Sequence, residues 1–179
     1  MSDDGRYTAE LDEEFVVFLI GMRINALWRV HEWLPVFLAM PRMLREIRSR
    51  DRAGLLESRT TVSWRGVTVI QYWEGFESLR AYAQDPEGEH HPAWVEYNTQ
   101  VADSGGVGIW HETYRVRPGD HETVYNNMPR QGLAAAGITR AADGNLTSAA
   151  GRLGRTDGQD APITPSGETA KAGEAGEDP

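Results

Sequence analysis

The stretch GLLESRTTVSWRGVTVIQYW, residues 54–73, decides the fold because it holds two β-rich runs separated by a tight link. Residues 54–64 and 66–73 are rich in β-branched and aromatic side chains, and Trp64-Arg65-Gly66 joins the two runs. A short link that contains glycine between two such runs is typical of a β-hairpin. We therefore predict two antiparallel neighbours in one sheet.

Amphipathic segments stand on both sides of this hairpin. Residues 32–50, 75–85 and 91–103 each carry apolar side chains at steps of three and four, which is the spacing of one helical face. In the first segment these side chains are Trp33, Phe37, Met40, Leu44 and Ile47. Pro41 predicts a kink or a break into two short helices, because proline lacks an N–H and crowds the preceding turn.

Two further β-rich runs enclose these elements, at residues 14–24 and 107–117. The order β-α-β-β-α-β, with the second helical region split in two, predicts a ferredoxin-like α+β fold in which helices cover one face of an antiparallel sheet. If the other face is apolar, a second copy of the chain would bury it, and the extended segment 121–129 is a candidate element for exchange between partners.

Composition divides the chain into three regions. Residues 1–11 are expected to form a flexible N-terminus, and residues 12–133 the folded domain. All Trp, Tyr and Phe residues lie before Met128, and from Ala134 the chain consists mainly of small and polar residues. Such a segment buries too little apolar area to offset its conformational entropy, so residues 134–179 are predicted to be a disordered tail.

Composition also excludes several classes of site and partner. The chain has no cysteine, which excludes disulfides and thiolate metal sites and fits a cytoplasmic protein. The N-terminus is acidic, unlike a secretory signal, and the longest apolar run, residues 15–22, is far shorter than the roughly 20 residues of a membrane-spanning helix. A net charge of −9 would repel nucleic acid. We expect neither a membrane nor a nucleic acid as partner.

The stretch GIWHETYRV, residues 108–116, places His111 beside Glu112 in a predicted strand. Alternate residues of a strand point to opposite faces, so the two side chains cannot form one catalytic dyad. His111 is either hydrogen-bonded core material or a proton carrier near neutral pH. Glu112 is expected to pair with an arginine, and the candidates are Arg23, Arg59 and Arg115.

Polar side chains inside the strands, surrounded by aromatic ones, predict a pocket for a small molecule. An apolar cavity with a few convergent polar groups is the usual composition of such a site. The alternative is that the aromatic residues only fill a small core. The polar candidates are Arg23, Glu57, Arg59 and Gln71, and the aromatic ones are Trp64, Tyr72, Trp73, Trp94 and Tyr97.

Two other groups of side chains leave alternatives open. His90 and His91 stand at a predicted helix start, where they could bind a metal or haem iron or could anchor a loop. Arginines at helical spacing over residues 41–52 form either a solvated helix face or a site for an anionic ligand. No phosphate-binding glycine motif opens a predicted helix, so a nucleotide or flavin is not implied.

Four blocks in order carry a family resemblance: FLIGMRIN (18–25), GFESLRAYAQDPEGEHHPAW (75–94), GIWHETY (108–114) and VYNNMPRQGL (124–133). Over roughly residues 10–135, the sequence resembles the small monooxygenase-like proteins related to the fumagillin-pathway polyketide monooxygenase. The resemblance implies a dimeric α+β barrel. It also implies an enzyme that oxidises an electron-rich aromatic or polyketide-type substrate with O₂ and without flavin, metal or haem.

In such a reaction a deprotonated phenol or enol passes an electron to O₂. Under this resemblance His111 or His91 would remove the proton, and Arg23 or Arg59 would stabilise the anion. The pocket walls would come from Tyr72, Trp73, Trp94, Trp64 and Tyr97. The same superfamily contains haem enzymes such as aldoxime dehydratases, in which case His91 or His90 would be the iron ligand. A barrel that binds a small molecule without turnover is the third possibility.

Overall fold

The computed structural model describes residues 5–49, 54–86, 95, 99 and 102–155, and it contains a four-stranded antiparallel sheet in the order β3-β4-β2-β5. The strands are β2 (Phe15–Ile24), β3 (Leu55–Ser63), β4 (Gly66–Trp73) and β5 (Val107–Val116). Helix α1 (Val30–Ser49) follows β2, and helix α2 (Phe76–Ala83) follows β4. This order of elements and strands confirms the predicted ferredoxin-like fold.

The hairpin forms where the sequence predicts it. Strand β3 ends at Ser63 and β4 begins at Gly66, so Trp64 and Arg65 make the turn. The backbone N–H of Ile24 donates to the carbonyl oxygen of Arg65 at 2.7 Å, which fastens the turn to the end of β2. The hairpin therefore forms one half of the sheet, with β3 at the edge and β4 beside β2.

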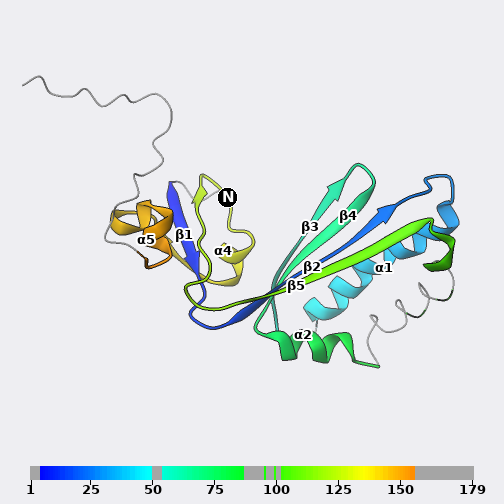
Figure 1. The fold of residues 1–179 in the computed structure, drawn as a ribbon, viewed down its shortest axis with the longest axis horizontal. Coiled ribbons are helices and arrows are strands. Elements are labelled where there is room, and N and C mark those ends of the chain that lie inside the picture. The colour runs from blue at the N-terminus through cyan, green and yellow to red at the C-terminus, as the bar shows by residue number, and fades with distance from the viewer. Residues whose placement is uncertain (1–4, 50–53, 87–94, 96–98, 100–101, 156–179) are drawn as a thin grey trace, which may run out of the picture.

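Both helices lie on the same side of this sheet (Figure 1). The side chains of Val16 and Trp73 oppose each other on that side, and both are fully buried. Leu79 and Tyr82 of α2 pack onto them, and Trp73 donates its indole N–H to Gln71 at 2.9 Å. The core of the ferredoxin-like unit therefore sits between the sheet and α2.

Helix α1 continues through Pro35 and Pro41, so the predicted break at Pro41 is wrong. Proline at this position removes the hydrogen bond to the carbonyl of Phe37. Because Phe37 and Pro41 are both exposed, water can reach the freed carbonyl. The helix tolerates the residue at the cost of one hydrogen bond.

A second sheet, in the order β6-β1-β7, extends the molecule beyond the start of β2 (Figure 1). Its strands are β1 (Arg6–Glu10), β6 (Tyr125–Asn126) and β7 (Ile138–Ala141), and the short helical elements beside it are α4 (Leu133–Ala136), η2 (Gly144–Thr147) and α5 (Ala149–Arg152). The predicted flexibility of residues 1–11 is thus wrong over β1, and the predicted disorder is wrong over residues 134–155. The rest of the predicted tail lies outside the described residues.

These segments are structured because β1 forms backbone hydrogen bonds with β7, and because a few side chains anchor the rest. Leu133 and Ala134 are buried with Phe15 in a core that also contains side chains of β1. The Arg152 side chain is only 4% exposed and donates to Glu122 at 2.7 Å and to two backbone carbonyls. Composition alone underestimates such long-range contacts.

Two other predictions concern short segments. Within the predicted exchange segment 121–129, β6 pairs with β1 of the same chain. The predicted helix 91–103 lies mostly outside the described residues; Val95 and Thr99 are helical, and η1 (Ala102–Ser104) follows. In the part of the chain that the structure describes, no helix is long and apolar enough to span a membrane.

Candidate active site

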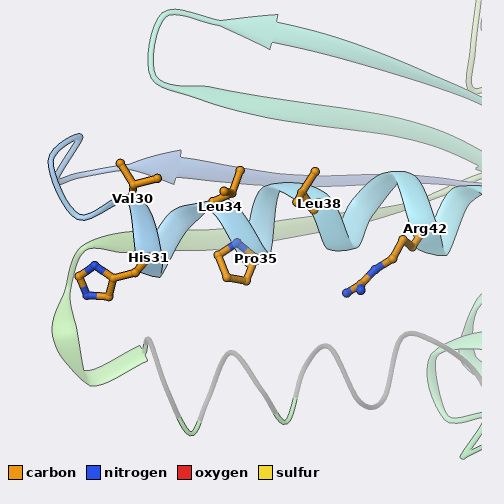
Figure 2. A pocket seen from close by; sticks show the side chains of 6 residues that line it. All are labelled: Val30, His31, Leu34, Pro35, Leu38 and Arg42. Atoms are coloured by element: carbon orange, nitrogen blue, oxygen red, sulfur yellow. The ribbon is translucent and has the colours of Figure 1, made fainter.

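An open groove of about 550 Å³ runs along the outer side of α1. It lies between two rows of side chains that share one helix (Figure 2). Residues four apart on a helix stack on the same side, so the sequence spacing produces both rows directly. One row is Val30, Leu34 and Leu38, and the other is His31, Pro35 and Arg42.

The floor of the groove is apolar although it faces outward. The exposed fractions are 46% for Val30, 39% for Leu34 and 50% for Leu38. An exposed apolar surface framed by polar residues is a common mark of a ligand site. The groove is therefore a candidate substrate site on the described residues.

At one end of the groove, His31 stands beside a fixed carboxylate. Its Nε2 lies 3.8 Å from Oε1 of Glu32, and the His31 side chain is 81% exposed. Glu32 itself is buried, and its other oxygen accepts a hydrogen bond from Ser104 Oγ at 2.8 Å. Arg29 donates to Oε1 at 3.3 Å. The imidazole thus stands near a fixed carboxylate, although 3.8 Å is beyond hydrogen-bond distance.

Gly106 makes room for this carboxylate. A Cβ atom at residue 106 would collide with the Glu32 side chain, and the backbone N–H of Gly106 donates to Ser104 Oγ at 3.1 Å. The loop before β5 thus fixes Glu32 from the side opposite the groove. The first turn of α1 and the start of β5 build this end of the site together.

A comparison with known protein families identifies the family of this chain. The family model described as "Monooxygenase af470-like" matches residues 15–133. The chain belongs to this family. A curated relative, monooxygenase af470 of Aspergillus fumigatus, is 33% identical over 125 residues, which cover 63% of this chain and 42% of that protein. The chain spans less than half the length of this relative.

One solved structure shares the fold of this chain. An aldoxime dehydratase crystallised with butyraldoxime has a TM-score of 0.63 and 14% identity, over 77% of this chain and 43% of that one. SnoaB, a cofactor-independent oxygenase from Streptomyces nogalater, has a TM-score of 0.42 and 11% identity, over 59% of this chain and 94% of that one. At 14% identity, the likeness to the aldoxime dehydratase shows a shared fold and carries no information about the chemistry.

The described members of the predicted site do not meet in one pocket of the af470-like chain. His111 and Trp73 lie on the face of the sheet that carries the helices, whereas Arg23, Arg59 and Tyr72 lie on the other face. Trp64 is in the hairpin turn and is 87% exposed. The remaining predicted residues, His90, His91, Trp94 and Tyr97, lie outside the described residues.

The strand parity predicted for His111 and Glu112 is confirmed. His111 pairs with Ile20 on β2, is exposed, and has its ring 5.6 Å from that of Phe18. Glu112 accepts a 2.6 Å hydrogen bond from the Tyr114 hydroxyl on the opposite face, which raises the pKa of Tyr114. Within the described residues Glu112 binds no arginine, and Arg115 binds Glu14 at 2.7 Å; an arginine partner across a dimer interface stays a prediction.

Tyr72 belongs to the junction between the two sheets. Burial raises the pKa of its hydroxyl, and the nearby Tyr125 adds to this rise, while Arg59 opposes it. The backbone N–H of Leu133 donates a hydrogen bond to Tyr72, and that of Ala134 donates to the Tyr125 hydroxyl at 3.3 Å. The two tyrosines therefore hold α4 against the main sheet, which is a structural task.

Three histidines lie in the described ranges. His31 and His111 are exposed, one in an open groove and one on a strand. His121 is half-buried, with its ring 5.1 Å from that of Phe15. Within the described ranges no three His, Asp or Glu residues gather as metal ligands. The histidines predicted as iron ligands, His90 and His91, lie outside those ranges.

Sequence reasoning missed His31, Glu32 and Arg42 as parts of one site. The signal was present, because VHEWLPVFLAMPR has a second set of residues at helical spacing beside the face predicted to be buried. Of that predicted face Leu44 is buried, but Phe37 is 37% exposed. An amphipathic helix with an additional apolar row on its outer side has more apolar surface than its own sheet needs.

Proposed function

We propose that this chain is a monooxygenase that uses O₂ to oxidise a small, electron-rich aromatic or polyketide-type molecule without a bound cofactor. Family membership over residues 15–133 supports the class of reaction. The groove on α1 supports the place, because it combines apolar side chains with one exposed imidazole beside a carboxylate. The His31–Glu32 arrangement is the observation that carries the assignment.

The reaction needs little from the protein. A methylene group flanked by phenolic rings loses a proton, the resulting carbanion or enolate gives an electron to O₂, and the collapse of the peroxide product leaves a carbonyl and water. Atoms balance as CH₂ plus O₂ gives C=O plus H₂O, so the substrate supplies all four electrons. The chain must remove the proton and stabilise an anion.

We assign proton removal to His31. Its Nε2 lies 3.8 Å from the carboxylate of Glu32, and its exposure leaves the ring accessible to a substrate in the groove. His111 and His91 were the bases predicted from the sequence. His111 remains a competitor because it lies on the helix-covered face of the same sheet.

Oxygen consumption distinguishes these bases. Purified protein is mixed with the phenolic anthrone dithranol in an oxygen electrode, and the spontaneous rate is subtracted. Replacing His31 by Ala is expected to lower kcat by about 100-fold or more, in line with the loss of a general base. His111→Ala is the matched control and is expected to keep the wild-type rate. The opposite pattern would move the base to β5.

The ultraviolet-visible spectrum of the same sample tests the absence of a cofactor. A colourless and metal-free sample that consumes O₂ supports the proposal. A Soret band would replace it by a haem enzyme. Tight binding of dithranol without O₂ consumption would replace it by a binding protein.

We propose further that a second copy of the chain covers the free face of the main sheet. That face presents Trp110, which is 39% exposed, and Tyr114, which is 51% exposed, beside the partly exposed Leu19 and Ile70. Leaving such side chains in water is unfavourable, and an isologous pair of sheets would bury them. The homodimer is the assembly that the family resemblance implies.

A further inference from the structure

The two ends of the α1 groove differ in a way that the proposed reaction does not use. His31 occupies one end, and Arg42 occupies the other. Eleven residues of α-helix separate them, which corresponds to roughly 16 Å along the axis. Because eleven residues are almost three full turns, the two side chains extend from the same side of the helix.

Between these ends the described lining residues are apolar: Val30, Leu34, Pro35 and Leu38. The volume of about 550 Å³ lies within the range of pockets that hold a complete small organic ligand. A molecule that lies along these residues would contact hydrocarbon between His31 and Arg42.

Within the part of the chain that the structure describes, Arg42 makes no ion pair or hydrogen bond. This contrasts with Arg29, Arg115, Arg140 and Arg152, each of which binds a carboxylate. A guanidinium beside an apolar surface favours a carboxylate that can accept two parallel hydrogen bonds. The net charge of −9 makes a local cation more important, because the protein as a whole repels anions.

We infer that the substrate of this groove is an elongated, mainly apolar organic acid whose carboxylate binds Arg42 and whose oxidisable end lies at His31. The inference rests on the proposed function for the identity of the reacting end. The anchoring by Arg42 stands on the geometry of the groove. For the basic segment 41–52, the sequence leaves open a solvated helix face or a site for an anionic ligand. The position of Arg42 in the groove favours the anionic-ligand site for this one arginine.

The test is a binding experiment with two matched probes, kept under nitrogen so that no turnover occurs. Pyrenebutyric acid and pyrenebutanol have the same aromatic body and differ in the charge of the terminal group. Both are titrated into the wild-type chain, and their emission is followed. We expect the acid to bind at least tenfold more tightly than the alcohol, and added salt to reduce this preference.

Variants of the groove locate the preference. Arg42→Gln is expected to bring the affinity ratio of acid to alcohol close to one, while Arg45→Gln, the same charge change at another exposed position of the helix, keeps the ratio. Leu34→Asn should weaken both probes to a similar extent. A ratio near one in the wild type, a ratio unchanged by Arg42→Gln, or no binding of either probe would overturn the inference.

The outcome is separable from that of the proposed function. An acid preference that depends on Arg42, without O₂ consumption, would leave the ligand class standing and would remove the reaction. O₂ consumption without any acid preference would leave the reaction and remove the role of Arg42.

Discussion

Gly21 and Trp110 oppose each other on the free face of the main sheet. Glycine at residue 21 lets the indole lie over the backbone of β2, because a Cβ there would be 2.5 Å from Trp110 Nε1 and 2.6 Å from Cε2. We predict that Gly21→Ala displaces the indole and lowers the free energy of unfolding by about 1–3 kcal/mol, the usual cost of overpacking. Chemical denaturation monitored by tryptophan fluorescence measures this change.

Two variants control the Gly21 experiment. Gly108 also lies in a strand, but a Cβ there would meet only the Asn25 side chain at 3.7 Å, so Gly108→Ala is expected to change stability by about 0.5 kcal/mol or less. In a Trp110→Ala background, Gly21→Ala should lose most of its effect. Equal losses in both backgrounds would show that the indole is not the reason for this glycine.

Tyr72 predicts a specific dependence of stability on alkaline pH. Its folded-state pKa is raised above the ordinary value of 10.0, so its stabilising contribution is complete below pH 10 and is lost as the pH rises through the folded-state value. Tyr72→Phe should cost about 1 kcal/mol at pH 8 through the lost hydrogen bond to Leu133. The difference from the wild type should shrink at pH 11.

Urea denaturation of both proteins at the two pH values provides the comparison. Parallel losses of stability in the wild type and in Tyr72→Phe would mean that other groups cause the alkaline destabilisation. The experiment thus tests whether burial at the junction of the two sheets governs this hydroxyl.

At the scale of elements, α1 contains a proline that the fold does not require. Pro41 is exposed, lines no part of the groove, and removes one helical hydrogen bond. We predict that Pro41→Ala raises the free energy of unfolding by about 1–2 kcal/mol, since alanine restores the bond and has a far better helix propensity. Thermal unfolding monitored by circular dichroism gives the measurement.

Pro118 offers a control of opposite sign. It lies in the turn after β5, where the N–H of Asp120 donates to the carbonyl of Arg117 at 3.0 Å. Pro118→Ala should lower stability by about 0.4–1 kcal/mol, because the unfolded chain gains freedom there. If Pro41→Ala lowered the melting temperature as well, the helix would depend on the shape of this proline.

The elements of the ferredoxin-like unit could be predicted because each has a strong local signal. The hairpin link at residues 64–66, the helical spacing after it and the strand parity at His111 all depend on residues close in sequence. The second sheet could not be predicted in this way. Its strand β7 is held by β1, more than 120 residues earlier, and ITRA has no distinct β pattern of its own.

The site was less predictable than the fold because a pocket depends on which faces meet. The local pattern predicts the correct parity for β5, yet Arg23 and Arg59 share a face that excludes Trp73 and His111. Of the aromatic residues predicted as pocket walls, Trp73 is fully buried core and Trp64 is in an exposed turn. The groove on α1 could not be predicted without knowing which side of the helix packs against the sheet.

For the whole molecule, the free face of the sheet predicts the oligomeric state. We expect a dimer in sedimentation equilibrium, and we expect Trp110→Arg to convert it to a monomer by removing a large apolar side chain from the interface and adding a charge there. His111→Arg is the matched control, since it adds the same charge at the next residue of β5 on the opposite face. A wild-type monomer, or a dimer insensitive to Trp110→Arg, would exclude this interface.

The most direct test of the account is the fate of labelled oxygen. Dithranol is incubated under oxygen-18 gas with the wild-type chain, with Leu34→Arg, which fills the groove, and with Ile138→Arg, which adds the same charge on β7. The account predicts a product with one oxygen-18 atom, formed faster than by spontaneous oxidation with the wild type and Ile138→Arg, and at the spontaneous rate with Leu34→Arg. A wild-type rate equal to the spontaneous one, or a rate unaffected by Leu34→Arg, would contradict it.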